Sequence, residues 1–276
     1  MTLYSTFEQT QRLRIRDGAT VPILSGCEAA PFKLIVVLPQ LGDFASLEYA
    51  WWLRRDSPAR ESLALEGVAL RAVAIGDRAG GQRFCDYTGF DPAHLFIDPA
   101  AGLHQQLGLY AGLGWKLPGL SAAQNGWLNL MLMCAGIGSP GTLSEVFRGY
   151  RGDRSAPQLI APDETVRAKP LPPIQGSTFD KAGGSGFQRP FELATLRLRN
   201  MAESLGHWST YVPDAAHLTQ RGGTFLFESQ SAQNHQNHLI YEHRDRGILG
   251  FSETMANPLT FLLAHTESHR SAAGAI

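Results

Sequence analysis

The stretch Lys33-Leu-Ile-Val-Val-Leu-Pro-Gln-Leu-Gly-Asp-Phe-Ala-Ser-Leu-Glu-Tyr-Ala50 decides the fold of this 276-residue chain. Its continuous apolar run at residues 34–38 predicts a buried strand, and a short turn follows that strand. The amphipathic pattern after the turn predicts a helix at about residues 44–55, with Asp43 or Ser46 placed to cap its first backbone N–H groups. A strand that leads through a turn into a helix is the opening unit of an α/β fold.

The sequence after this stretch repeats the strand–helix unit up to about residue 110. Buried strands are predicted at residues 68–75 and 94–97, and helices at about 81–87 and 103–109. Strands that alternate with helices indicate βαβ units, so we expect an α/β fold in which helices flank a central mixed sheet.

A glycine- and proline-rich segment at about residues 112–189 interrupts this order. A structureless loop of that length is improbable in a compact domain, so we expect an insertion that packs on the core and holds helices at 122–135 and 142–148. An amphipathic helix at 191–205 follows it.

The C-terminal part predicts a β-hairpin from strands at 223–228 and 238–243, and a last helix at 257–265 that covers the sheet. We expect one domain over residues 1–276, with a lead-in arm in the first thirty residues, a core at about 30–115 and 205–265, and a disordered tail at 268–276.

Composition excludes several classes of protein. Lys plus Arg (24) nearly balances Asp plus Glu (25), so the basic excess of a general nucleic-acid binder is missing. The first residues do not resemble a signal peptide, and three widely spaced cysteines do not suggest a disulfide scaffold. We therefore expect a reducing compartment, the cytoplasm or its plastid equivalent. The apolar segment 127–137 is too short to span a bilayer, which leaves at most a peripheral membrane contact.

Four groups of residues carry a family resemblance. They are the strand–turn–helix at 33–53, Ala72-Val-Ala-Ile-Gly-Asp77 with Phe84-Cys-Asp-Tyr-Thr-Gly-Phe90, Leu95-Phe-Ile-Asp-Pro99 with Leu107-Gly-Leu109, and Gln220-Arg-Gly-Gly-Thr-Phe-Leu-Phe227 with Leu239-Ile-Tyr-Glu-His-Arg-Asp245. Together they resemble the peroxiredoxin-like branch of the AhpC/TSA antioxidant family, which implies a thioredoxin-like fold. Gly149-Tyr-Arg-Gly-Asp153 and Gln188-Arg-Pro-Phe-Glu-Leu193 resemble the long forms found in cyanobacteria and plastids.

The resemblance implies a reactive cysteine in the turn after the first core strand, often as Gly-Cys-x-x-Cys. Carried over by position, the two thiols fall at Asp43 and Ser46, and the arginine that assists the related peroxidases falls at Arg221. Neither turn residue is a thiol, so the resemblance predicts the family fold without the usual peroxidase site.

Two interpretations of these polar residues stay open. Asp43 and Ser46 could simply cap the helix. Alternatively, Asp43, Ser46 and Arg221 form a vestigial polar pocket that binds a small molecule or a partner loop. An aspartate cannot undergo thiol oxidation, and no base that would activate Ser46 is identifiable.

The three cysteines offer a different chemistry. Cys85 and Cys134 fall on predicted helices and are expected to be inert buried thiols. Cys27 lies before the first core strand and is expected to be more exposed. A displaced redox cysteine, Cys27 or Cys85, is the alternative that would make the chain a thiol-dependent antioxidant oxidoreductase.

Two further groups of residues are candidate binding sites. His235, His238 and His243 cluster at the hairpin and are weak candidates for a metal, and no cofactor is expected. Apolar side chains near the start of the insertion are the best candidate for a protein-binding patch, and these are Trp127, Leu130, Met131 and Met133. We therefore favour a non-catalytic binding, assembly or regulatory module in redox or photosynthetic physiology, with a protein partner on the 112–189 insertion.

Overall fold

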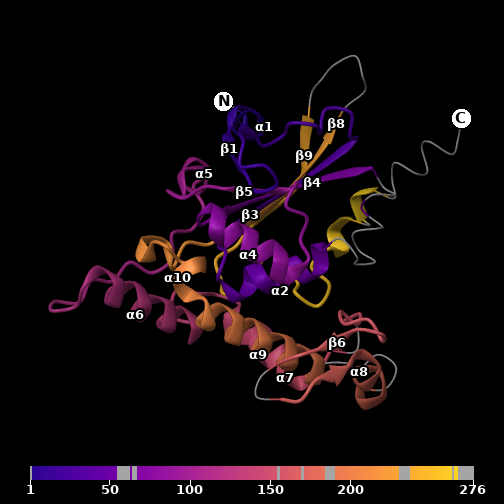
Figure 1. The fold of residues 1–276 in the computed structure, drawn as a ribbon. Coiled ribbons are helices and arrows are strands. Elements are labelled where there is room, and N and C mark those ends of the chain that lie inside the picture. The colour runs from indigo at the N-terminus through magenta and orange to yellow at the C-terminus, as the bar shows by residue number, and fades with distance from the viewer. Residues whose placement is uncertain are drawn as a thin grey trace, which may run out of the picture.

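A seven-stranded mixed sheet with the strand order β2-β1-β5-β4-β3-β8-β9 forms the centre of the computed structural model (Figure 1). The structure describes residues 2–54, 63, 67–153, 156–168, 171–183, 190–229, 237–262 and 264–266. The sheet strands are β1 Gln11–Arg14, β2 Thr20–Pro22, β3 Phe32–Gln40, β4 Val68–Ile75, β5 Leu95–Ile97, β8 Gly223–Ser229 and β9 Asn237–Arg244. Helices flank this sheet, which confirms the expected α/β fold with thioredoxin-like character.

Strand β3 lies at the heart of the sheet, and every one of its residues is buried. It pairs in parallel with β4 and antiparallel with β8. Leu34, Val36 and Leu38 belong to one hydrophobic cluster, whereas Ile35 and Val37 belong to a second cluster. Because successive side chains of a strand point to opposite faces, a continuous apolar run is what a strand covered on both faces requires.

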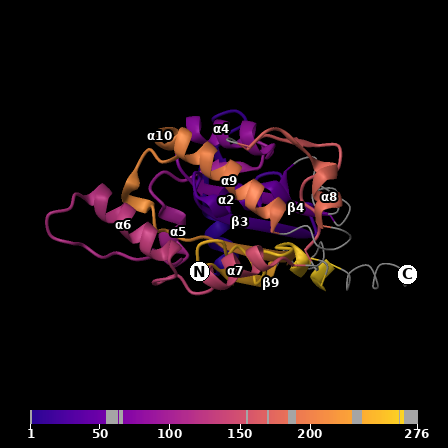
Figure 2. The same cartoon turned by 90° about the horizontal axis from the view of Figure 1, so that it is seen from below.

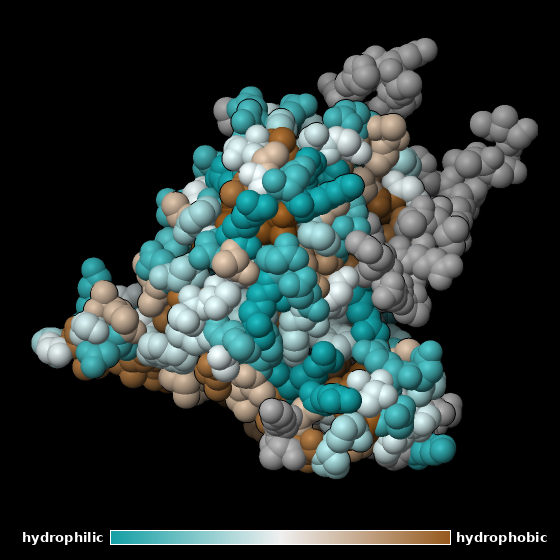
Figure 3. Space-filling view, in the orientation of Figure 1, coloured by the Kyte–Doolittle hydropathy of each residue, from teal (hydrophilic) through white to brown (hydrophobic). Residues whose placement is uncertain are grey.

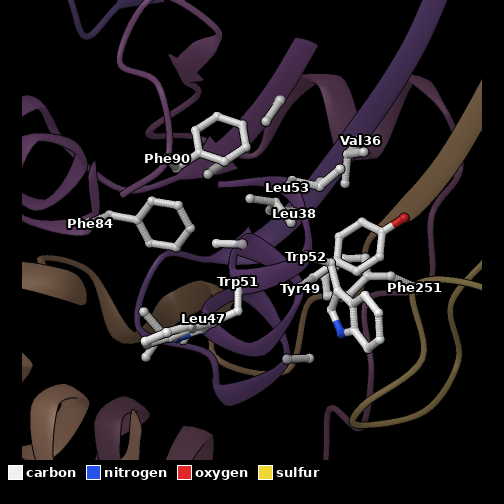
Figure 4. Close-up of a cluster of buried hydrophobic side chains, with 14 of the residues drawn as sticks. Val36, Leu38, Leu47, Tyr49, Trp51, Trp52, Leu53, Phe84, Phe90 and Phe251 are labelled. Atoms are coloured by element: carbon white, nitrogen blue, oxygen red, sulfur yellow. The ribbon is translucent and has the colours of Figure 1, made fainter. Parts of the chain in front are cut away.

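Helix α2 (Phe44–Leu53) follows the turn after β3, and only Arg54 separates its end from the undescribed residues 55–62. The sequence predicted an amphipathic helix, but every residue from Ala45 to Leu53 is buried. The reason is that α9 (Phe191–Gly206) packs along the outer side of α2 while the sheet covers its inner side. Figure 4 shows Trp51, Trp52 and Tyr49 in this core, where the Tyr49 ring stacks on Phe251 with centroids 5.0 Å apart.

The first thirty residues contribute two strands to the sheet and are part of the core. Strand β1 pairs with both β2 and β5, so the sheet extends beyond the expected core boundary at residue 30. Helix α1 (Leu3–Gln9) packs beside it, and the Phe7 ring contacts Phe225 and Phe227 at centroid distances of 5.2 and 5.8 Å.

The expected insertion holds helices α6 (Ala122–Cys134) and α7 (Thr142–Arg151), close to the predicted bounds. It continues with a two-stranded sheet of β6 (Thr165–Val166) and β7 (Ile174–Gln175) and with α8 (Gly176–Gly183). Helices α6, α7 and α9 lie side by side below the main sheet (Figures 1 and 2). The other helices are α4 Arg78–Thr88, α5 Gly102–Gln106, α10 Trp208–Tyr211 and the 3-10 turn η1 Ala215–His217.

The predicted hairpin is confirmed as β8 and β9, which pair antiparallel. Helical residues follow from 260, and the Phe261 ring stacks on Tyr241 with centroids 3.9 Å apart, so this segment covers the outer strand as expected. The predicted tail at 268–276 lies outside the described residues.

Candidate functional site

The turn between β3 and α2 is closed by an ion pair. Asp43 is the N-cap of α2, and its Oδ1 accepts a hydrogen bond from the Ala45 N–H at 2.9 Å. Its Oδ2 accepts from Nη2 of Arg221 at 2.8 Å. The side chains of Asp43 and Arg221 are 6% and 0% exposed. The structure therefore brings together two of the three residues of the expected polar pocket and buries them as a charge pair.

Arg221 comes from the segment just before β8 and is held at several atoms. Its Nε donates to the Thr219 carbonyl at 3.1 Å, and its backbone N–H donates to the Tyr110 carbonyl at 2.8 Å. These bonds fix the guanidinium in front of the N-terminus of α2, where a carboxylate is also favoured by the helix dipole.

Ser46, the third expected residue, has a structural role. Its hydroxyl is fully buried and donates to the Gln40 carbonyl at 3.0 Å. The backbone N–H of Asp43 donates to the same carbonyl at 2.9 Å. Ser46 therefore links the first turn of α2 to the end of β3, and its hydroxyl forms no hydrogen bond with a base among the residues that the structure describes.

Asp245 is a site residue that the sequence arguments missed. It follows β9, is 1% exposed, and its Oδ1 accepts from the Gly247 N–H at 2.8 Å. Burial raises the pKa of Asp245 to about 8, and Arg221 acts in the opposite direction. Nη1 of Arg221 and Oδ2 of Asp245 have no hydrogen-bond partner among the described atoms. Asp245 is the last residue of the stretch 239–245 that carries part of the family resemblance, and this position was the signal in the sequence that could have pointed to it.

Cys134 also lies near this charge pair. It is the last residue of α6 and is half-buried. Burial raises the pKa of its thiol, the Asp43 carboxylate raises it further, and Arg221 lowers it. The sequence interpretation of an inert helical cysteine did not place it beside Asp43, because nothing local connects residue 134 to residue 43.

The two alternative thiols are deeply buried. Cys27 is 1% exposed, so the expectation that it is more accessible was wrong. Arg71 of β4 donates to the carbonyls of Ile23 and Ser25 and holds the Cys27 turn against the sheet. Burial is the largest cause that raises the pKa of Cys27, and it raises the pKa of Cys85 to about 12. Both environments disfavour the thiolate that peroxide chemistry requires.

The histidines do not assemble into a metal site within the described part of the chain. His235 lies outside the described residues, and His238 is exposed on β9. Nε2 of His243 donates a hydrogen bond to the Gly250 carbonyl at 2.9 Å, and burial lowers the pKa of His243.

The four apolar residues predicted as a binding patch do not share one surface. Trp127 packs on Trp208 with ring centroids 4.4 Å apart, and Met133 is fully buried in the core. Leu130 is half-buried, and Met131 alone of the four is well exposed, at 60%. The prediction that Met133 faces a partner was wrong, because α6 turns that side toward the core.

Ten exposed large apolar side chains nevertheless come from α6, α7, α9 and the segments that adjoin α6. We call them the α6–α7–α9 face, which comprises Trp115, Leu117, Leu120, Met131, Ile137, Leu143, Phe147, Tyr150, Met201 and Leu205. Figure 3 shows hydrophobic atoms along the lower edge of the molecule, beneath α6 and α9. Large exposed apolar patches mark interaction sites on soluble proteins.

Comparison with known proteins identifies the family of this chain. No curated protein matches the chain. Among the helices of the described segments, none combines the length and apolarity that a membrane crossing needs. The family model described as AhpC/TSA antioxidant enzyme matches residues 52–247, more than two thirds of the chain, and begins just after the turn at 42–46. The chain therefore belongs to the AhpC/TSA family.

Proposed function

We propose that this protein is a non-catalytic member of the AhpC/TSA family that binds a protein partner through the α6–α7–α9 face. The family match begins at residue 52, so the assignment of Asp43 to the position of the reactive cysteine rests on the resemblance of the strand–turn–helix alone. Residues 42–46 read Gly-Asp-Phe-Ala-Ser and contain no thiol.

The geometry of the turn supports this proposal. Peroxide reduction by this family needs a thiolate at the helix N-terminus, where the positive end of the helix dipole lowers a thiol pKa. In this chain the Asp43 carboxylate occupies that point and is paired with the guanidinium of Arg221. A carboxylate cannot form a sulfenic acid or a disulfide, so neither step of the thiol cycle can start there.

A displaced thiol is less well supported than the binding function. Cys27 and Cys85 are buried, and the pKa of each is raised. Cys134 is more accessible, but the first two causes acting on its pKa, burial and Asp43, both disfavour the thiolate. Because the nucleophile toward peroxide is the thiolate, all three environments work against that reaction.

The single observation that carries the proposal is the extent of the α6–α7–α9 face. With side-chain areas of about 150–250 Å² for large residues, the exposed fractions of its ten members add to roughly 1,000 Å². A standard protein–protein interface covers about 800 Å² on each partner, so this face is large enough for one.

The charges on the same helices indicate the chemistry of the partner. Arg148 pairs with Glu145 and Asp153, and Arg197 pairs with Glu48 and Glu145. These cations are already neutralised within the molecule. Arg151 of α7 differs from these two, because it is exposed and its guanidinium lies 5.8 Å from the centre of the Phe147 ring. The face therefore suits a protein surface that is largely apolar and carries at most a weak negative charge, because a strongly charged partner would be desolvated there without compensation.

Site-specific photo-crosslinking tests this function. A photoreactive phenylalanine analogue is placed at Phe147 on the face or, as a matched control, at exposed Gln82 on α4. We expect a specific product from position 147 alone, which can be a second copy or another protein. The purified partner should then bind Phe147→Ser at least tenfold more weakly than the wild type. Identical products from both positions, no product from position 147, or unchanged affinity would contradict the proposal.

A further inference from the structure

A pocket of about 340 Å³ opens between α7 and α9. Val146 of α7 and Leu193, Leu198 and Met201 of α9 contribute to its mainly apolar lining. Its volume lies at the lower end of the range for small-molecule sites, about 300–1,000 Å³. The pocket is thus of a size for a small molecule, and it overlaps the exposed apolar face at Tyr150 and Met201.

The inner lining connects the pocket with the Asp43 site. Phe44, the residue after Asp43, and Cys134 both line it. The Cys134 thiol is close enough to Asp43 and Arg221 for both charges to act on its pKa. A molecule in the pocket would therefore lie against the Cys134 side chain, beside the buried ion pair.

The polar groups of the lining are mostly engaged by the protein itself. Arg197 donates from Nε to Glu48 at 2.8 Å and from Nη2 to Glu145 at 3.0 Å. The Thr142 hydroxyl oxygen accepts from the Ile248 N–H at 2.8 Å. Within the described lining, no charge is left uncompensated, so burial of a charged ligand there would cost free energy that no side chain repays.

Two unusual backbone positions border the pocket. Gly149 stands where α7 approaches α9, and a Cβ at that position would lie 2.6 Å from Cδ2 of Leu193. A larger residue there would collide with Leu193, which also lines the pocket. Leu249, which also lines it, has a φ of 75°, an uncommon conformation for a residue other than glycine. Such strained residues concentrate at ligand sites, where the surrounding structure holds them.

We propose that this pocket binds an uncharged small molecule with an apolar body. The selectivity follows from the lining. Apolar contacts supply the affinity, and Arg197 is already paired with Glu48 and Glu145, so it is not available to bind a carboxylate or sulfonate of a ligand. This inference does not depend on the protein partner, because the pocket and the α6–α7–α9 face share only Tyr150 and Met201.

Two dyes with the same ring system test the proposal on the purified full-length protein. N-phenyl-1-naphthylamine is neutral, and 1-anilinonaphthalene-8-sulfonate carries an added sulfonate. We expect saturable binding of the neutral dye at one site, and at least tenfold weaker binding of the anion. Phe147→Ser should leave the affinity for the neutral dye unchanged, since Phe147 lies on the face and does not line the pocket.

A pair of variants locates the bound dye. Ala194 is exposed and lines the pocket, whereas Ala202 is exposed on the same helix and does not line it. Ala194→Trp should fill the entrance and weaken binding of the neutral dye at least tenfold, and Ala202→Trp should leave it unchanged. Equal loss in both variants, or none in either, would overturn the assignment.

Thiol labelling of the wild type gives a second readout that requires no variant. Saturating neutral dye should slow alkylation of Cys134 by N-ethylmaleimide at least fivefold, as measured by peptide mass spectrometry. The buried Cys27 and Cys85 serve as internal controls whose labelling should not change. Unchanged Cys134 labelling, or equal affinity for the two dyes, would refute the proposal even if Ala194→Trp failed to fold.

Discussion

Asp43→Asn removes one charge from the buried pair and changes little else. Asparagine keeps the shape of the side chain and an Oδ1 that can still accept from Ala45, so the helix cap survives. Arg221, however, is left fully buried with hydrogen bonds to the Thr219 and Leu218 carbonyls, and Asp245 is the acidic group that remains beside it. Breaking a buried ion pair from one side costs about 3–5 kcal/mol, and we expect the free energy of unfolding to fall by that amount.

Urea unfolding of four proteins measures this effect: wild type, Asp43→Asn, Arg221→Met and the double variant. We expect the double variant to lose clearly less than the sum of the single losses, because the second change removes the charge that the first left unpaired. Asp77→Asn is the matched control. Asp77 caps α4 through the Gly80 N–H at 2.8 Å, and no described cation forms an ion pair with it, so the loss of stability in Asp77→Asn should stay within about 1 kcal/mol.

Two results would refute this reasoning. One is a cost of Asp43→Asn no greater than that of Asp77→Asn, which would mean that the carboxylate acts only as a helix cap. The other is a coupling energy below about 1 kcal/mol in the double-mutant cycle, which would mean that Asp43 and Arg221 do not stabilise each other.

Three further predictions concern stability. Asp245 has a folded pKa of about 8, above the unfolded value near 4, so the wild type should lose stability as pH rises between these values. Asp245→Asn should remove that loss, and equal pH slopes in urea unfolding would contradict the assignment. Glu48→Gln should lower the free energy of unfolding by about 3 kcal/mol, which is the low end for a broken buried ion pair because Arg197 still pairs with Glu145. The control Glu8→Gln, at an exposed position, should change the free energy of unfolding little. Trp127→Ala should lower the free energy of unfolding by about 2 kcal/mol, because the ring contact with Trp208 is lost. Met131→Ala should lower it by less than about 0.5 kcal/mol, because Met131 is exposed. A larger loss for Met131→Ala than for Trp127→Ala in thermal unfolding would be inconsistent with the observed packing.

Local sequence signals determined much of the fold. The apolar run of β3 is continuous because both of its faces are covered, and the turn after it starts α2 at the expected capping residue. The amphipathic interpretation of α2 failed because α9, which covers its outer side, begins 147 residues after Phe44 and leaves no trace in the local pattern. Burial of Trp51 involves that distant contact, because the Arg199 guanidinium of α9 lies 4.5 Å from the centre of its ring.

The candidate site, too, depends on contacts between residues that are far apart in the sequence. Asp43 and Arg221 were named from separate stretches 178 positions apart, and the structure joins them. Asp245 and Cys134 could not be added from the sequence, because their effect depends on burial beside that pair. The error about Cys27 has a similar origin, since Arg71 holds its turn against the sheet from another strand.

The reaction of the wild-type protein with peroxide tests the central claim most directly. Stopped-flow mixing with hydrogen peroxide, followed by mass spectrometry of Cys27, Cys85 and Cys134, measures the rate at which each thiol is oxidised. With Asp43 in the turn and the thiol pKa values raised, we predict that no cysteine reacts faster than free cysteine at the same pH. Oxidation of any one thiol at least a hundredfold faster than free cysteine would contradict a non-catalytic function.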